Sequence, residues 1–291
     1  MSPLRKPAKI IVLAAVSAAA LAAGAALAQE RWFPSKWGAD DTLGAINNLS
    51  PQGVQRAVKL VKTGQVYSLA IPTGPDSPVY GRRSYTAEIS PAPGGDTRPD
   101  GSGRVTSHDE KVTTSMGIGT QMDGLGHLGI DHHYYNGLTG AQVNTPEGFK
   151  KLEMSKIPPI VTRGVVIDMA RHFGVSMLKE GQAFNRAEIE AAMKAQKIKI
   201  GKGDVVLFHT GWMQMIEKDK ALYQRAEPGL GEEGAKWLAD LGVVAIGADT
   251  IALEPLPAVE RGKTFIVHQT LLAKKGVHIL ENINTDRKSV V

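Results

Sequence analysis

Short, continuous apolar runs separated by helical patterns dominate the second half of the chain. Such runs are typical of strands buried on both faces, because a half-exposed strand alternates polar and apolar residues. Between the runs, Asn185 is a good N-cap for a helix ending near Gln196, and residues 231–241 are amphipathic. Strands that alternate with helices predict an α/β protein with a covered sheet. The expected strands are residues 164–169, 204–209, 243–247 and 277–280.

The region before residue 108 is less regular. Ser50-Pro51 has the residue types of a helix N-cap and first position, so we expect a helix from there to about Val61. Residues 66–71 have the apolar character of a strand. Residues 72–107 are rich in Pro, Gly, Ser and Arg, and a segment of this length without periodicity is usually functional or partly disordered. We expect it to form a long loop over the pocket.

The N-terminal segment, residues 1–28, has the parts of a secretory signal peptide. Three basic residues precede an Ala-rich apolar run over residues 10–28, which closes on the small-x-small cleavage site Ala26-Leu27-Ala28. We expect cleavage there, a single domain over residues 29–291, and a periplasmic or secreted protein. The alternative is an uncleaved membrane anchor, since the run is long enough to span a bilayer.

Composition excludes several classes of site. Without residues 1–28 the chain has 31 Lys and Arg against 29 Asp and Glu, a net charge of +2. No basic block indicates nucleic acid, and we expect no membrane contact after signal cleavage. The absence of cysteine excludes disulfides, thiolate metal ligands and a cysteine nucleophile. Two G-x-G-x-x-G matches, at residues 124–129 and 229–234, do not follow an expected strand within a βαβ unit, so they do not indicate dinucleotide binding.

The segment from Gly119 to His127 combines a carboxylate, an amide and an imidazole. Strand alternation places Gln121 and Asp123, and with less regularity His127, on one face. Oxygen and nitrogen donors that converge from one edge are suited to a divalent metal. The alternative is that Asp123 caps a turn and His127 is an ordinary loop residue.

Further candidates lie near the C-terminus. An apolar run around His268 leads into a Lys-Lys-Gly turn and back to Glu281, a strand-turn-strand path that would bring both side chains to one pocket. The alternative, favoured by spacing alone, is a buried polar histidine and a strand-end glutamate. Asp249 and Glu254 follow a buried strand, where ligands collect in α/β sheets, although Asp249 is better explained as a turn cap.

Three aromatic residues are candidates for an apolar substrate site: Trp37, Tyr135 and Trp212. Tyr135 follows His127 closely in the sequence, and Trp212 follows the end of an expected strand. Packing in the core is the more common role of tryptophan.

The motifs resemble those of the cyclase-type metal hydrolases, which include bacterial kynurenine formamidase and isatin hydrolase. That family is marked by H-x-G-T-H-x-D-x-P-x-H, and residues 117–127 align with it. The resemblance continues through residues 37–41, 203–212, 247–250, 268–272 and 276–281.

The resemblance implies a swivelling β/β/α domain with a mixed, largely buried sheet flanked by helices, a divalent metal (Mn²⁺ or Zn²⁺), and a homo-oligomer, either a dimer or a tetramer. The motif's metal-binding His, His and Asp correspond to Gly117, Gln121 and Asp123. His127 corresponds to an acid/base residue or further ligand, and His268 and Glu281 to ligands of a second metal.

Two departures from the motif change the expected site. Gly117 has no side-chain donor, and Gln121 offers only a neutral oxygen. A subgroup with T-Q-x-D-G-L-x-H resembles this chain more closely. We therefore expect one metal held by a set of side chains in which oxygen ligands suit Mn²⁺ at least as well as Zn²⁺: Gln121, Asp123, His127, His268 and Glu281.

The resemblance implies hydrolysis of a C–N or C–O carbonyl bond in a ring-bearing small molecule, namely an aryl formamide, a cyclic amide or imide, or a lactone. His127 or Glu281 would transfer the protons. One alternative is a metal-dependent lyase or cyclase that acts through an enolate. Another is a non-catalytic periplasmic binding protein, because two histidines of the motif are absent.

Overall fold

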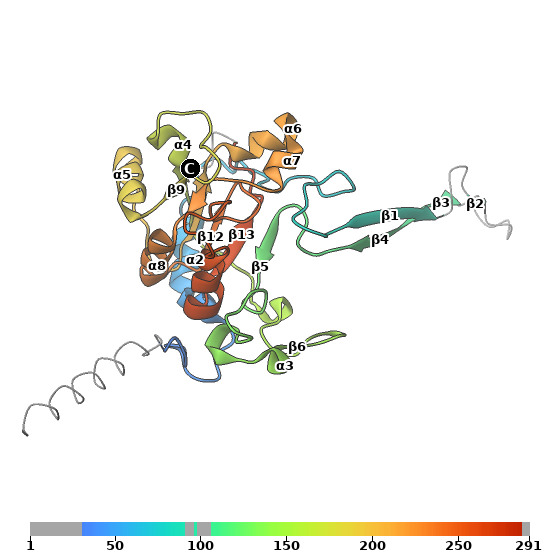
Figure 1. Cartoon of the computed structure of the whole chain (residues 1–291), viewed down its shortest axis with the longest axis horizontal. Coiled ribbons are helices and arrows are strands. Elements are labelled where there is room, and N and C mark those ends of the chain that lie inside the picture. Colours follow the sequence, from blue (N-terminus) through green and yellow to red (C-terminus); the bar gives the residue numbers. More distant parts are fainter. Residues whose placement is uncertain (1–30, 91–95, 98–105, 287–291) are drawn as a thin grey trace, which may run out of the picture.

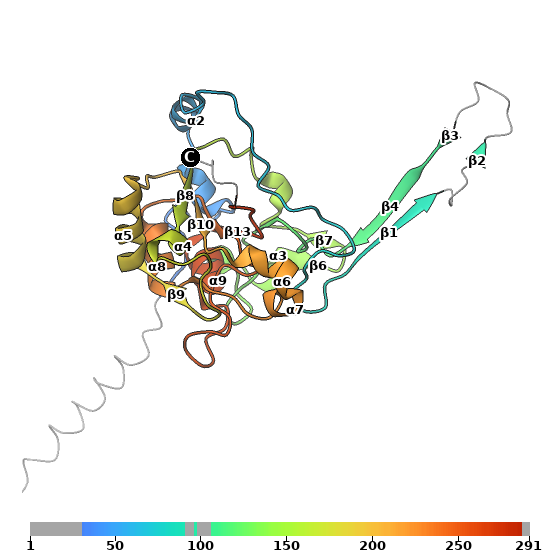
Figure 2. The same cartoon turned by 90° about the horizontal axis from the view of Figure 1, so that it is seen from above.

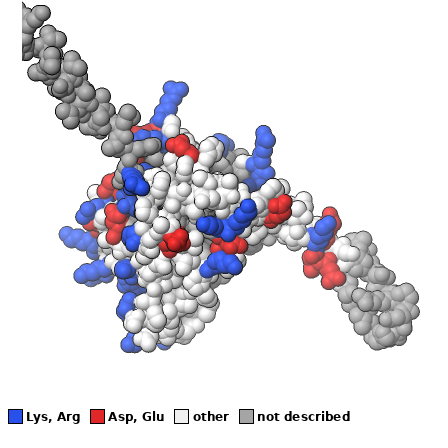
Figure 3. Space-filling view, turned by 90° about the horizontal axis from the view of Figure 1, so that it is seen from below, with Lys and Arg blue, Asp and Glu red and all other residues white. Residues whose placement is uncertain are grey.

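The computed structural model of the chain describes residues 31–90, 96–97 and 106–286, so the expected signal peptide, residues 1–28, lies outside the described residues. Among the helices in the described ranges, none is both long and apolar enough to cross a membrane. Figure 1 shows a body of sheet and helices from which one hairpin projects. On the face drawn in Figure 3, acidic and basic side chains lie around a broad area without charged residues.

A five-stranded sheet forms the centre of the body, with the strand order β5-β13-β12-β10-β8. Four strands run parallel, and β5 at one edge runs antiparallel to β13, so the sheet is mixed. Most side chains of the parallel strands are buried, which explains their continuous apolar sequences. The bounds are β5 (Gln121–Asp123), β8 (Gly164–Asp168), β10 (Val205–His209), β12 (Ala245–Ala248) and β13 (His278–Glu281).

Helices flank this sheet (Figure 1). α5 (Arg186–Gln196) packs against β8, and α8 (Glu232–Asp240) packs against α5 and against the π-helix η5 (Gln269–Lys275). Asn185 forms a capping box at the start of α5, and its Oδ1 accepts the N–H of Gly234 at 3.0 Å. One side chain therefore fixes the first turns of two helices. The other helices are η1 (Gly44–Asn48), α2 (Pro51–Val58), η2 (Tyr135–Gly137), α3 (Gly140–Val143), η3 (Met154–Lys156), α4 (Met169–His172), η4 (Trp212–Gln214), α6 (Met215–Lys218), α7 (Lys220–Tyr223) and α9 (Ile266–His268).

The prediction of an α/β fold with a mixed, largely buried sheet flanked by helices is confirmed. Each expected parallel strand is present, with ends that differ by one or two residues. Ser50 caps α2 as expected, since its Oγ accepts the N–H of Gly53 at 3.1 Å, but the helix ends at Val58 rather than Val61.

The prediction of a strand at residues 66–71 is wrong. The segment has no regular secondary structure, and no strand in the described residues pairs with it along its length. Single hydrogen bonds hold it instead: the N–H of Ile71 donates to Thr120 Oγ1, and the N–H of Asn284 donates to the carbonyl of Leu69.

The prediction of one long loop over residues 72–107 is wrong in part. The segment contains β1 (Tyr85–Ser90), which pairs antiparallel with β4 (Asp109–Thr114). The hairpin projects away from the body in both views (Figures 1 and 2). The smaller strand pairs are β2 (Asp96–Thr97) with β3 (Thr106–Ser107), β6 (Asn144–Thr145) with β7 (Gly148–Phe149), and β9 (Ala183–Phe184) with β11 (Gly229–Leu230).

The strand-turn-strand path expected around His268 is also wrong in its first half. The apolar run forms α9 and η5, and Gly276 ends η5 with a φ of +64° before β13 begins. A short apolar run fits a buried helix as well as a buried strand, so periodicity alone could not distinguish them.

Asp249, directly after β12, joins the ends of two parallel strands. Its carboxylate is fully buried and accepts the N–H and the hydroxyl of Thr210, at 2.9 and 2.6 Å, and the N–H of Gly211 at 2.8 Å. These donors belong to the loop after β10. Asp249 is therefore a structural acceptor between neighbouring strands rather than a cap of its own turn.

Replacement of Asp249 by asparagine should destabilise the protein, because an amide cannot accept all three hydrogen bonds at their present geometry. We expect a loss of about 2–3 kcal/mol in the free energy of unfolding, measured by urea denaturation. Asp240→Asn is the matched control, since the Asp240 side chain is 65% exposed and pairs only with Lys275 among the described residues. Equal midpoints for the two variants would contradict the assigned role.

Candidate metal centre and active-site groove

Pairing of β5 with β13 places the motif carboxylate beside a carboxylate from the far end of the chain. Gln121 lies opposite Glu281, and Asp123 lies opposite Ile279. Side chains that face each other across a ladder share one face of the sheet, and so do residues two apart along a strand. Gln121, Asp123 and Glu281 therefore lie on the same face, as alternation predicted for the first two.

A buried cluster of two carboxylates and one imidazole forms on this face. His268, on α9, brings its Nε2 to 3.2 Å from Glu281 Oε1 and 3.6 Å from Asp123 Oδ2. One ligand atom from each of the three residues lies within 4.8 Å of the others, and each residue is less than 10% exposed. In the described ranges no other group of three or more His, Asp or Glu residues has this metal-site spacing.

Two oxygen atoms beside the cluster are buried without a hydrogen-bond partner among the described residues. They are Gln121 Oε1 and Asp123 Oδ2. Gln121 Nε2 donates to Glu281 Oε2 at 2.5 Å, which leaves its oxygen free. Buried acceptors without donors are costly unless a cation or water satisfies them, so the residues present fit a bound cation.

Glu254 orients His268 from behind. Its Oε1 lies 2.7 Å from His268 Nδ1 and also accepts the His268 N–H at 2.9 Å, while Oε2 accepts the Val267 N–H at 3.2 Å. The ring nitrogen facing Asp123 and Glu281 is then Nε2. A carboxylate behind a histidine ligand is the usual way to fix its tautomer and raise its basicity. Its position after a buried strand was the available sequence signal for Glu254.

Electrostatics in the cluster favour a bound cation. Burial alone would lower the pKa of His268, but the nearby carboxylates of Asp123, Glu254 and Glu281 outweigh it and raise that pKa well above its usual value. Burial raises the pKa of Glu281, and the hydrogen bond from His268 opposes this rise. A proton on His268 thus supplies the positive charge that the carboxylates need when no metal is bound.

His127 stands at the edge of the cluster. Its Nε2 is 3.8 Å from Asp123 Oδ2, its side chain is 40% exposed, and its ring centre lies 6.5 Å from that of His268. Burial lowers the pKa of His127, the charge of Asp123 opposes this, and His268 and Arg83 lower it further. The imidazole is therefore neutral at neutral pH and can accept a proton.

A groove of about 360 Å³ leads to the cluster. Gln121, Asp123 and His127 line it together with Arg83, which sequence reasoning missed because it lies in the segment expected to be a loop. Its remaining side-chain walls are mostly apolar and come from Met116, Met122, Phe149, Leu152 and Met154. The structure thus brings the expected metal-site residues together beside an apolar surface.

The three aromatic residues expected to bind substrate do not line this groove. Tyr135 is 1% exposed, and its hydroxyl donates to Asp41 Oδ2 at 2.6 Å. Trp37 packs against the main core near Tyr135 and lines a separate cavity. Trp212 is 3% exposed in a second core cluster. Each has a packing role away from this groove, and substrate binding by these residues stays a prediction.

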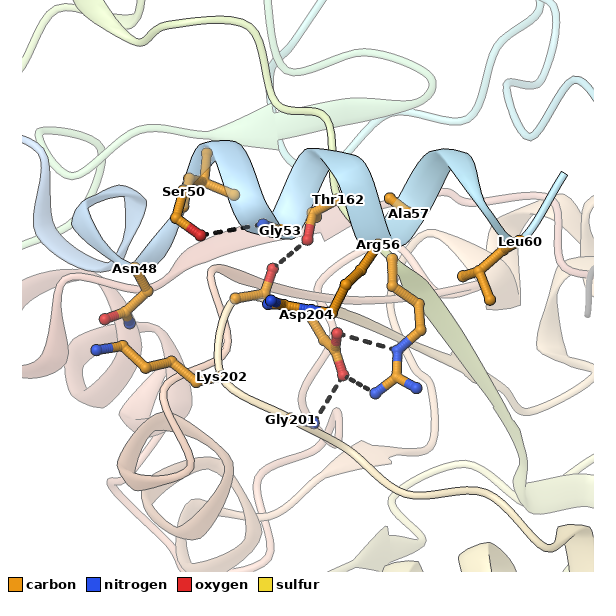
Figure 4. Close-up of a pocket in the computed structure, with 13 residues that line it drawn as sticks. Asn48, Ser50, Gly53, Arg56, Ala57, Leu60, Thr162, Gly201, Lys202 and Asp204 are labelled. Atoms are coloured by element: carbon orange, nitrogen blue, oxygen red, sulfur yellow. Dashed lines mark hydrogen bonds and ion pairs between the residues drawn. The ribbon is translucent and has the colours of Figure 1, made fainter.

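A second cleft, of about 480 Å³, lies between α2 and the loops at residues 162–163 and 201–204 (Figure 4). Its carboxylate, Asp204, is occupied by two hydrogen bonds from Arg163, at 3.1 and 2.6 Å. The described residues place no histidine there. This cleft therefore lacks the chemistry present beside β5 and β13.

Comparison with known proteins identifies the family and the fold. The Cyclase family model, described as "Putative cyclase", matches residues 67–255, well over half of the chain. The crystal structure of a novel cyclase superposes with a TM-score of 0.79 at 29% sequence identity, covering 86% of each chain.

More distant structures share the fold. An isatin hydrolase bound to the product analogue thioisatinate has a TM-score of 0.57 at 16% identity, covering 83% of this chain and 89% of its own. Isatin hydrolase A from Labrenzia aggregata, bound to benzyl benzoate, has a TM-score of 0.56 at 20% identity, covering 80% and 87%. No curated protein matches the sequence. The extent of the family match shows that this chain belongs to the cyclase family.

Proposed function

We propose that the protein is a metal-dependent hydrolase of a C–N or C–O carbonyl bond in an aryl formamide, a cyclic amide or imide, or a lactone. The observation that carries this is the buried cluster of Asp123, His268 and Glu281, with an unpartnered oxygen on Asp123 and a neutral imidazole beside it. Isatin, the compound named for two related structures, is a cyclic amide, which supports this substrate class.

The side chains present suit one divalent metal, Mn²⁺ or Zn²⁺. Asp123, His268 and Glu281 would hold it, and Gln121 Oε1 is available as a neutral ligand. A bound metal of this kind lowers the pKa of a water molecule and polarises a carbonyl oxygen. Glu254 keeps His268 in the tautomer that a metal requires. Because His268 must be deprotonated to bind a metal, protons compete with the metal at this position.

His127 is the residue placed to transfer protons. It lines the groove, is partly exposed, and is neutral because burial lowers its pKa. A neutral imidazole accepts a proton from a water nucleophile and returns it to the leaving group. Glu281, the other expected acid/base residue, is 3% exposed and has both oxygens in hydrogen bonds. It is better placed as a ligand than as a proton carrier.

The proposal extends to cellular context and assembly. The signal-peptide pattern of residues 1–28 supports export to the periplasm or beyond.

One face of the β1–β4 hairpin supports a homo-oligomer, since Ala87 lies opposite Val112 and Ile89 shares their face. Ile89 and Val112 are 51% and 48% exposed, and such an apolar ribbon is stabilised when another surface covers it.

Self-association through this face should be sensitive to charge. Val112→Asp is expected to shift the oligomer toward the monomer, measured by light scattering of the purified protein, because a carboxylate would be buried against an apolar surface. Thr113→Asp, on the opposite face of the same strand, is the matched control. A monomeric wild-type protein would contradict this part of the proposal.

Removal of either cluster ligand should abolish tight metal binding. His268→Ala and Glu281→Gln are each expected to weaken Mn²⁺ and Zn²⁺ binding by at least tenfold, measured by calorimetric titration of the chelator-treated protein. His132→Ala is the control, since His132 is exposed and outside the cluster. Wild-type protein that binds neither metal would contradict the proposal.

His127→Ala should lose turnover while it keeps the metal. We expect kcat to fall by about 10²–10⁴-fold, because the proton transfers lose their positioned imidazole. Turnover is measured on a panel of aryl formamides, cyclic imides and lactones, with metal content measured in parallel. Simultaneous loss of metal would identify His127 as a ligand, and a metal-loaded wild type that hydrolyses nothing in the panel would contradict the hydrolase assignment.

A further inference from the structure

Arg83 occupies the space that a side chain at position 117 would need. A Cβ built on Gly117 would lie 2.6 Å from Arg83 Cζ, 2.8 Å from Nη1 and 2.9 Å from Nε. Arg83 Nη1 also donates to the Gly117 carbonyl at 2.7 Å. Gly117 is not among the glycines with positive φ, so a side chain there would meet no backbone strain and would have to displace the Arg83 guanidinium.

The base of the projecting hairpin holds Arg83 in this position. The N–H of Ser115 donates to the Ser84 carbonyl at 2.9 Å, and the N–H of Ser84 donates to Ser115 Oγ at 3.2 Å. These bonds continue the β1–β4 ladder by one residue pair. Arg83 directly precedes Ser84, so these bonds at the base of the hairpin direct it toward Gly117 at the wall of the groove.

The guanidinium contributes a fixed positive charge to the groove. Arg83 lines the groove with Gln121, Asp123 and His127, and its charge lowers the pKa of both His127 and Glu281. One of its donors is used by the Gly117 carbonyl. Among the described residues no Asp or Glu forms an ion pair with it, so the remaining donors are available to an anion.

We propose that Arg83 binds a carboxylate on an aromatic substrate in this groove, an inference that rests on the proposed hydrolase function. A guanidinium forms paired, charge-assisted hydrogen bonds with a carboxylate. Phe149 and Met154, which are 47% and 39% exposed, offer apolar contact to a ring. A groove of about 360 Å³ is of a size that accepts a single-ring compound. The substrate class is therefore an acylated derivative of an aromatic acid that keeps a free carboxylate.

Binding of 2-aminobenzoate to the full chain, with and without Mn²⁺, tests this without turnover. We expect Arg83→Gln to weaken binding of this anion by about tenfold or more, and Arg83→Lys to weaken it less, since lysine keeps the charge and loses the fork. Gly117→Ala should reproduce the effect of Arg83→Gln, because the new Cβ displaces the guanidinium. Arg82→Gln is the matched control, as Arg82 is exposed and does not line the groove.

The neutral isostere 2-aminobenzamide separates charge recognition from misfolding. Its affinity should be the same for the wild type and Arg83→Gln, whereas a misfolded variant would lose both ligands. Equal 2-aminobenzoate affinity in the wild type and Arg83→Gln, or no binding to the wild type, would overturn the inference. Hydrolysis of a neutral aryl formamide should likewise be the same in the wild type and Arg83→Gln, whereas an equal loss of neutral and carboxylated formamide hydrolysis in Arg83→Gln would overturn the inference while the hydrolase function stands.

Discussion

The antiparallel pairing of β5 with β13 is the contact on which the site depends. It joins residues about 160 positions apart in the chain and sets Gln121 directly opposite Glu281. Just beyond the ladder, Thr120 Oγ1 donates to the Asn282 carbonyl, and Asn282 Nδ2 donates to the Gly119 carbonyl at 3.0 Å. A slip of one residue would turn Asp123 to the opposite face, so these side-chain bonds also protect the position of the carboxylate.

The cluster places carboxylates where water is largely excluded. The free-energy cost of burying their negative charge must be offset by hydrogen bonds or by positive charge. Asp123, Glu254 and Glu281 are all less than 10% exposed, with His268 between them. A protonated imidazole satisfies them only in part, since Asp123 Oδ2 still has no partner among the described residues. A divalent cation offsets more of this charge than one proton can, which is the physical reason for regarding the cluster as a metal site.

Local sequence patterns predicted the features that depend on residues close together in the chain. The apolar strands and the Asn185 cap could be predicted because burial on both faces and helix capping leave signatures within a few residues. Alternation correctly placed Gln121 and Asp123 on one face. The sequence did not indicate that the aromatic residues lie away from the groove, because exposure depends on tertiary packing and Tyr135, with its partner Asp41, is part of the core.

Features that depend on distant partners could not be predicted in the same way. Glu254 contacts His268, which lies on a helix that the sequence pattern favoured as a strand. Arg83 has its role because hairpin register carries it to Gly117, 34 residues further along the chain. Neither contact leaves a periodic signal, so the motif showed what was missing at Gly117 but not what had replaced it.

The exchange at Gly117 changes the kind of positive charge in the groove. The family motif has a histidine there, and its imidazole is a metal ligand. This chain has no donor at 117, a neutral amide at 121, and a guanidinium over the glycine. A guanidinium stays charged across the physiological range and binds oxyanions through a planar fork, but it cannot activate water as a metal does. The remaining carboxylates and His268 therefore suit one metal for the chemistry, while Arg83 keeps positive charge where the motif would place another ligand.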